Sequence, residues 1–376
     1  MNIEIYEVKT RRDFRDFIKL PAKIHKNHKN WVPPLYSDDY QFFNSKKNRA
    51  FQYSDTLLLL AKKESKIVGR VMGIINHKYN EIHGENDARF CFMETYNDYE
   101  VVDALISYIE NWGKQKGMNR LVGPLGFSDK DPQGLLIEGF DAPNVIATNY
   151  NFEYMIDLLE KAGFSKKTDL VVYKLMILEE IPKFYERINS RAIKINHNKK
   201  VIEFKTRRQI RPYIRSVLQL MNETYKDIYA FAPLDVKEMD EFANRYLLIL
   251  DPKFIKVIIN DLNEVIAFII SMPDISEGIK KSKGHLFPFG IFQILQSQKK
   301  TKQLNLLLGA IREDCRNMGL DTIMGVKIFE EAQKAGIEYI DSHLILESNT
   351  KMRAELERMG GNIYKRYRIY ARDIAS

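Results

Sequence analysis

One stretch, residues 304–372, limits the folds open to this chain more than any other. Its segments alternate between strand and helix patterns: strand 304–311, polar turn 312–319, helix 321–335, strand 338–346, helix 349–359 and strand 362–371. This order predicts an α/β unit in which a turn leads from the first strand into the first helix. Because the first amides of a helix have no partner within it, such a junction is suited to binding an anion.

An internal repeat indicates that the fold occurs twice. A helix pattern ending at Gly163 is followed by a strand containing Tyr173, and the same spacing separates Gly360 from Tyr370. The length of 376 residues is enough for two hydrophobic cores. We therefore predict domains at 1–178 and 201–376, joined by a linker at 179–200 that is helix-like from Pro182 and then basic and polar.

The strand, the turn Arg316-x-x-Gly319, the helix, and Asn349 before a helix ending in Gly resemble the second half of a GNAT acyltransferase fold. Further motifs, including Trp31-Val-Pro-Pro-Leu35, resemble a group of poorly characterised bacterial proteins with two GNAT-like halves. The resemblance implies an α/β (α+β) fold: a tandem duplication of the GNAT acyl-CoA N-acyltransferase fold, with mixed sheets flanked by helices. It also implies that the turn binds the pyrophosphate of acetyl-CoA or a longer acyl-CoA.

The expected cofactor-binding residues surround this turn. They are Ile311, Arg316, Asn317, Met318, Gly319, Leu320, Asp321 and Asn349. Asp321 departs from the small residue of the GNAT pattern, and its carboxylate is a competitor for the same amides. Asn349 either holds the pantetheine amide or only caps the helix. In the N-terminal half, the equivalent turn 95–100 has no glycine and carries two acids, so we expect that half to be degenerate.

Acyl transfer to an amine needs a base for the incoming ammonium and an acid or dipole for the departing thiolate. The tyrosine that GNAT enzymes often carry seven residues after the Asn is Leu356 here. The substitutes in the same unit are Glu347, His343 and Tyr364, with Glu347 the first choice of base. Each has a structural alternative. Glu347 could instead form an ion pair with Lys351 or Arg353. His343 could be a structural histidine in its strand, and Tyr364 could lie in a strand that only pairs at the sheet edge.

The amino-acid composition limits the kinds of ligand and binding partner that the chain suits. The net charge of +8 suits acidic partners such as CoA phosphates, anionic lipid headgroups or RNA, although many Lys-rich chains are merely basic. Two cysteines and seven scattered histidines predict no metal site and a reducing cytoplasm. The aromatic segment from Leu286 to Leu295, between basic flanks, has the composition of a membrane-surface contact at the inner membrane or of the lip of an acyl channel. A loop buried against the sheet is the structural alternative.

These observations predict an N-acyltransferase that moves an acyl group from acyl-CoA to an amine. The charge and the segment 286–295 favour a long-chain or amphiphilic substrate, as in bacterial ceramide synthases, which also look GNAT-like. Two alternatives stay open. One is an aminoacyl-tRNA-dependent transferase, since the Fem-type ligases also pair two GNAT folds, and the other is a non-catalytic binding protein. No DNA partner is expected.

Overall fold

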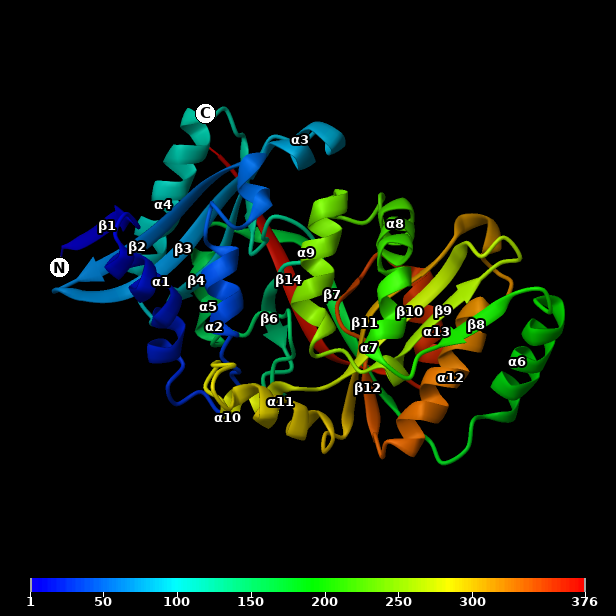
Figure 1. Ribbon diagram of the computed structural model, residues 1–376. Helices are drawn as coiled ribbons and strands as arrows, with labels where there is room; N and C mark the ends of the chain where they lie inside the picture. The colour runs from blue at the N-terminus through cyan, green and yellow to red at the C-terminus, as the bar shows by residue number, and fades with distance from the viewer. Residues whose placement is uncertain (1, 375–376) are drawn as a thin grey trace.

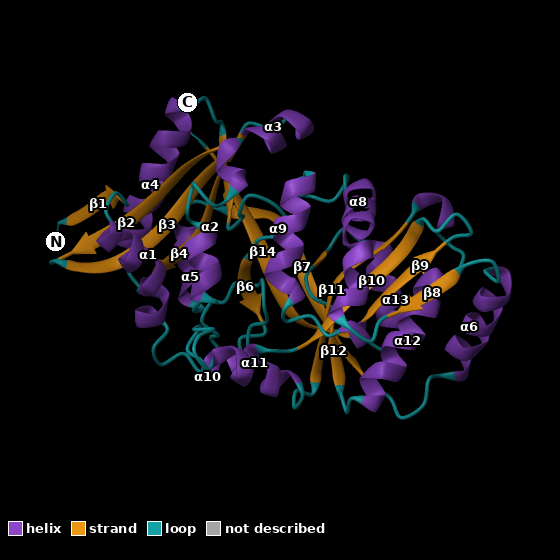
Figure 2. Cartoon of the chain, viewed as in Figure 1, coloured by secondary structure: helices purple, strands orange, loops and turns teal. Residues whose placement is uncertain are grey.

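The computed structural model describes residues 2–374, and helices flank a twisted sheet that runs through the whole molecule (Figures 1 and 2). The N-terminal half contains β1 (Ile3–Glu7), α1 (Arg11–Ile24), α2 (Tyr36–Phe42), β2 (Ser54–Lys63), β3 (Lys66–Asn76), α3 (His77–His83), β4 (Asp87–Thr95), α4 (Tyr99–Gln115), β5 (Arg120–Gly123), β6 (Leu135–Glu138), α5 (Tyr154–Lys161) and β7 (Ser165–Met176).

The C-terminal half repeats this order after a connecting helix. It contains α6 (Lys183–Ile195), β8 (Lys200–Glu203), α7 (Arg207–Ile210), α8 (Ile214–Thr224), α9 (Val236–Leu247), β9 (Ile255–Ile259), β10 (Val265–Pro273), α10 (Ser276–Lys281), α11 (Gly290–Gln298), β11 (Gln303–Ile311), α12 (Leu320–Lys334), β12 (Tyr339–Asp341), β13 (Ile345–Leu346), α13 (Thr350–Arg358) and β14 (Asn362–Asp373). Short 3-10 turns lie at Arg49–Gln52, Arg211–Tyr213, Pro252–Phe254 and Glu313–Cys315.

The two halves exchange their last strands. The strand order is β1-β2-β3-β4-β5-β14-β7-β12-β11-β10-β9-β8, with β6 pairing β14 and β13 pairing β7. The final strand of the chain therefore lies beside β5 of the first half, and β7 of the first half lies beside β12 of the second. The two exchanged strands pair with each other antiparallel along most of their length. In Figure 1, β14 crosses the centre of the molecule toward the N-terminal half.

Apolar faces explain why each helix packs where it does. In the first half, α4 and α5 bury one face of the sheet and α1 and α2 the other, and Tyr370 of β14 belongs to the first of these cores. In the second half, α8 and α9 cover one face, while α12 and α13 pack on the other. Tyr370 is fully buried, so the exchanged strand contributes to the core of the half it joins.

One predicted segment differs in detail. The predicted strand 338–346 is broken into β12 and β13, because His343 adopts a left-handed backbone conformation with φ of 56° between them. The helix-like part of the segment 179–200 is α6, which packs across the start of α12. Because one sheet runs through both halves, the domain boundaries at 178 and 200 stay a prediction.

Candidate active site

The sheet of the second half splits open between two parallel strands. β11 pairs with β12 only from Gln303 to Asn305, opposite Tyr339 to Asp341. Beyond that point β11 continues along β10, while the chain after β12 follows β7 through β13. The edge of β11 from Leu306 to Gly309, which we call its free edge, pairs with no other strand among the described residues, and it lines a cavity.

A polar network fixes the point at which the strands part. The buried Asn305 amide donates to Asp274 (3.2 Å) and accepts from Gln303 (2.6 Å). Asp341, which is fully buried, accepts from the hydroxyl of Tyr364 and from the backbone amide of His343 (2.6 Å). Because buried polar groups are costly unless paired, these bonds anchor the two strands to different neighbours where they part: Asn305 to Asp274, and Asp341 to Tyr364 of β14.

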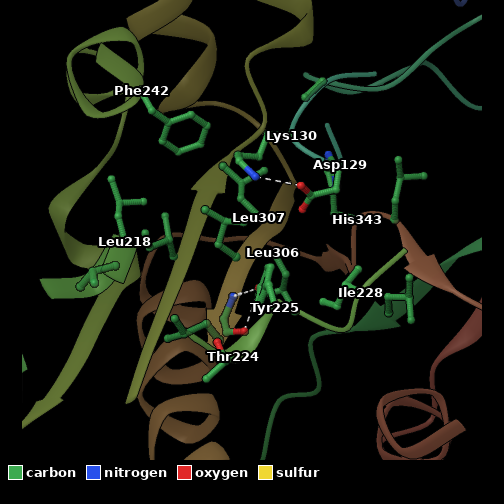
Figure 3. A pocket seen from close by; sticks show the side chains of 18 of the residues that line it. Asp129, Lys130, Leu218, Thr224, Tyr225, Ile228, Phe242, Leu306, Leu307 and His343 are labelled. Carbon is green, nitrogen blue, oxygen red and sulfur yellow. Dashed lines mark hydrogen bonds and ion pairs between the residues drawn. The ribbon is translucent and has the colours of Figure 1, made fainter. Parts of the chain in front are cut away.

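The cavity has a volume of about 640 Å³ and is mostly apolar. Its wall is formed by side chains of α8, α9, the loop after α8 and the open strand β11 (Figure 3). Apolar lining residues include Leu218, Ile228, Phe242, Leu247, Leu306 and Leu307. The volume lies within the range of protein sites for small organic ligands, and the lining suits an alkyl chain.

The N-terminal half closes one side of this cavity. Asp129 and Lys130, from the turn-rich loop between β5 and β6, line it and form an ion pair of 2.8 Å. The same ammonium donates to the carbonyl of Ala232 (2.8 Å), and the amide of Asp129 donates to the carbonyl of Ala230 (3.0 Å). Burial raises the pKa of Asp129. Neither residue is among the predicted site residues, and their only signal in the sequence is the many turn-forming residues of their loop.

His343 lies in the cavity wall, at the break between β12 and β13. Its Nε2 atom is 3.1 Å from the carbonyl oxygen of Ile146, and since a carbonyl only accepts, Nε2 carries the proton. Burial lowers the pKa of His343, so the imidazole is neutral and its Nδ1 atom keeps a lone pair. A neutral imidazole in an apolar cavity is able to accept a proton.

Tyr225, which sequence analysis did not single out, occupies the free edge of β11. Its hydroxyl donates to the carbonyl of Gly309 (2.9 Å) and accepts from the amide of Gly309 (3.2 Å). Burial raises the pKa of Tyr225 to about 12, so the phenol keeps its proton at neutral pH. The hydroxyl is thus a hydrogen-bond donor in the cavity wall, beside the open strand.

The predicted anion site is a row of open backbone amides. Asn317 and Gly319 both have positive φ, and Gly319 precedes α12 without any side-chain cap. Between residues 2 and 374, no group accepts a hydrogen bond from the amides of residues 317–322. Asp321 is exposed and does not cap the helix, so the expected competition from its carboxylate is absent among the described residues. The amides are therefore free to bind an anion.

Two of the predicted cofactor residues line the cavity itself. They are Arg316 and Asn349, and Arg316 is exposed and makes no ion pair with any residue in the described range. The side chain of Asn349 also accepts from the amide of Met352 (3.2 Å), so it caps α13 while facing the cavity. The others are absent from the cavity wall: Ile311 ends β11, Asn317, Met318 and Gly319 lie in the turn, and Leu320 and Asp321 begin α12.

The other two predicted catalytic residues are engaged elsewhere. Glu347 accepts from the ammonium of Lys166 (2.8 Å) and the amide of Asp169 (3.0 Å), which places it in an ion pair across to β7. The ion-pair partner predicted for Glu347 was Lys351 or Arg353. Tyr364 donates to Asp341 in the polar network. Neither residue is part of the cavity lining; of the three predicted catalytic residues, only His343 is.

The corresponding junction of the first half makes side-chain contacts of its own. β4 and β5 also pair over a short stretch and then part, but the hydroxyl of Tyr154 on α5 donates to the carbonyl of Thr95 (2.8 Å). The rings of Phe90 and Phe164 pack together at 5.2 Å. At the start of α4, the carboxylate of Asp98 accepts from the amide of Glu100 (3.1 Å).

Comparisons with known proteins agree with this architecture. No family model matches the chain. Protein YghO of Escherichia coli (strain K12) is 25% identical over 375 residues, which is 97% of this chain and 94% of that protein. A bacterial ceramide synthase of Caulobacter vibrioides (strain NA1000 / CB15N) is 25% identical over 376 residues, covering 98% of this chain and 97% of the relative. Within residues 2–374, no helix is long and apolar enough to cross a bilayer.

Solved structures agree on the fold. A tandem GNAT protein from the clavulanic acid biosynthesis pathway superposes with a TM-score of 0.57 at 9% identity, covering 100% of this chain and 99% of that one. A GCN5-related N-acetyltransferase from Sphaerobacter thermophilus superposes with a TM-score of 0.53 at 10% identity, and the match covers 100% of this chain and 96% of that one. Together with the repeated halves and the parted strands β11 and β12, these matches identify the chain as a protein with the tandem GNAT fold.

Proposed function

We propose that the chain is an N-acyltransferase that moves an acyl group from acyl-CoA to an amine, and that it prefers a long acyl chain. The observation that carries the proposal is the continuity of three features. The free edge of β11, the unpaired Arg316 and a cavity of about 640 Å³ lined by apolar side chains form one site, beside the open amides of residues 317–322. In this proposal the diphosphate of CoA binds to the backbone amides, and the alkyl chain of the acyl group lies in the cavity.

The proposed chemistry uses two side chains. The amine nitrogen attacks the thioester carbonyl, the new C–N bond forms, the C–S bond breaks, and CoA leaves as a thiolate. The neutral imidazole of His343 is the candidate base, because its Nδ1 lone pair can take the proton that the amine loses. The hydroxyl of Tyr225 keeps its proton and donates it to the carbonyl of Gly309. Once it turns from that carbonyl to the ligand, it is the candidate donor to the developing negative charge, because the position of the usual tyrosine is Leu356 here.

An amphiphilic amine is the proposed acceptor. The relative from Caulobacter vibrioides bears the name of a ceramide synthase, an activity that would join a fatty acyl group to a sphingoid amine. The lining of the cavity supports the same class, since an amine with an alkyl tail has an apolar part to bury and a polar head to pair. Asp129, the only carboxylate there besides Asp227, is a candidate partner for the ammonium of the acceptor.

The cavity favours acyl-CoA over aminoacyl-tRNA. Its lining contains only two cationic side chains, Lys130 and Arg316, and Lys130 is already paired with Asp129. Binding a nucleic acid backbone draws on many such cations. A gel-shift titration with charged tRNA distinguishes the two, because the acyl-CoA enzyme should not retard the RNA.

The test of the proposal is ligand-induced stabilisation with free CoA, acetyl-CoA and palmitoyl-CoA. A ligand at a hundred times its Kd adds about 2.7 kcal/mol to the free energy of unfolding and raises the Tm by several degrees. We expect all three to stabilise the protein, palmitoyl-CoA the most. Absence of a shift with every thioester would refute the proposal and favour a non-catalytic binding protein.

One substitution locates the phosphate end of the site. Arg316→Glu should weaken all three ligands by about 10- to 100-fold, because a hydrogen bond to a charged group contributes about 1.5–3 kcal/mol. The matched control is Arg11→Glu, the same change at an exposed position on α1 in the other half. Gly319 is a poorer choice, since a Cβ there would lie 2.7 Å from the Cβ of Ala192 and any side chain would strain its φ of 76°.

A further inference from the structure

Three phenylalanines stand out from the surface of one helical hairpin. This segment, which we call the aromatic hairpin, comprises residues 276–300 with α10 and α11. Phe287, Phe289 and Phe292 are 81%, 70% and 67% exposed. Exposed aromatic side chains gathered within six positions of one segment are unusual in a soluble protein and mark a contact surface.

The rest of the hairpin is held firmly against the body of the protein. Ile279 and Ile294 are buried, and they pack with Tyr246, Leu250 and Leu307. A Cβ on Gly290 would lie only 1.7 Å from the carbonyl oxygen of His285, so the corner between the loop and α11 closes on a bare backbone. The three aromatic rings are therefore displayed by an anchored support and not by a free loop.

Basic residues surround the rings on both sides in the sequence. Lys281, Lys283, Lys299 and Lys300 are exposed, and none forms an ion pair with a residue between 2 and 374. No aspartate or glutamate occurs from Gly278 to Arg312. The surface thus combines protruding aromatic side chains with uncompensated positive charge, which is the combination found where proteins lie on anionic bilayers.

The hairpin also shares a wall with the cavity. Tyr246, Leu250 and Leu307, which pack against Ile279 and Ile294, line the cavity as well. The side chain of Gln298 on α11 donates to the carbonyl of Ile249 (2.6 Å), at the end of the segment that carries Tyr246. In Figure 1, α10 and α11 lie along the lower edge of the molecule, where the two halves meet.

We propose that the aromatic hairpin docks the protein on an anionic membrane surface, with Phe287, Phe289 and Phe292 inserted among the lipid headgroups. The cavity then lies beside the bilayer in which an amphiphilic amine and its acylated product would partition. This second statement rests on the proposed function, whereas the docking itself does not. A second copy of this chain is a poorer occupant, because two such surfaces face to face would bring their unpaired lysines together.

The experiment is sedimentation of the full chain with vesicles of phosphatidylcholine, alone or mixed with phosphatidylglycerol. We expect binding to the anionic vesicles only, weakened by salt. The triple variant Phe287→Ser, Phe289→Ser, Phe292→Ser should lose at least about tenfold in vesicle affinity. Leu262→Ser is the control, since Leu262 is 76% exposed in the turn between β9 and β10. Replacing Lys281, Lys283, Lys299 and Lys300 by Gln should abolish the preference for anionic lipid.

Three outcomes would overturn the docking proposal: no binding of the wild-type chain to anionic vesicles, unchanged binding of the triple variant, or a triple variant that changes the oligomeric state in solution instead. The stabilisation by palmitoyl-CoA, measured without vesicles, separates this proposal from the enzyme proposal. The triple variant should keep that stabilisation, which also shows that it folds. If the wild-type chain binds vesicles but no thioester stabilises it, the acyltransferase proposal fails and the docking stands.

Discussion

The substitution Leu218→Phe should shorten the acyl chain that the cavity accepts. Leu218 lies on α8 and its side chain lines the cavity (Figure 3). Phenylalanine is larger by about three heavy atoms, so it takes the room of about three methylene groups, each worth about 0.8 kcal/mol when buried. The loss for a chain that fills the cavity is about 2.4 kcal/mol, or about 60-fold in Kd. Acetyl-CoA does not reach the apolar wall, so its affinity should not change.

The assay is calorimetric titration with a series of saturated acyl-CoAs from acetyl to palmitoyl. In the wild-type protein the affinity should rise with chain length and then level off, and in the variant it should level off earlier by about three carbons. Leu248→Phe is the matched control, because Leu248 is 68% exposed and does not line the cavity. Equal losses for acetyl-CoA and palmitoyl-CoA, or no loss for either in a folded variant, would refute the assignment of this cavity to the acyl chain.

Three further predictions follow from the residues described above. His343→Gln should lower kcat at least about 100-fold without changing the Kd of palmitoyl-CoA. Because burial lowers the pKa of His343, the wild-type activity should persist below pH 6.5 before it falls. A wild-type rate already halved near pH 7 would contradict this. Burial, and then the charge of His25, lower the pKa of His28 from 6.5 to about 4. Its neutral form therefore stabilises the fold above pH 6.5, and this contribution is lost as the pH falls toward 4, so His28→Gln should flatten the denaturation midpoint over that range, as followed by circular dichroism. Residues 1–178 expressed alone should be insoluble, because β5 loses its neighbour β14. Co-expression with residues 179–376 should restore a soluble pair that copurifies. A soluble, cooperatively folding fragment 1–178 would show that the strand exchange is dispensable.

Local signals made part of this structure predictable. The apolar run 304–311 predicts a strand, and β11 lies there. Gly319 predicts a turn into a helix and Asn349 a helix cap, and they precede α12 and α13. The tandem GNAT fold was predicted from the resemblance of these motifs to that superfamily, and the repeat of Gly and Tyr indicates two copies of one fold. These features depend on neighbours in sequence, so periodicity and turn chemistry reveal them.

What could not be predicted depends on distant neighbours. The cavity draws its wall from α8, α9 and a loop of the first half, and nothing near Asp129 or Lys130 in the sequence points to Phe242 or His343. The pairing of Glu347 with Lys166 involves β7, which belongs to the other half of the chain. Periodicity also placed one continuous strand at 338–346, although the positive φ at His343 ends β12 and turns that side chain into the cavity wall.

The exchanged strands bear on how the chain is made. A ribosome delivers β5 long before β14, so the sheet of the first half stays incomplete until nearly the whole polypeptide has emerged. During that interval the edge of β5 and the core around Tyr370 are exposed, a situation that favours association with chaperones or with the wrong strand. The nascent protein is therefore expected to mature in one late step and not one half at a time.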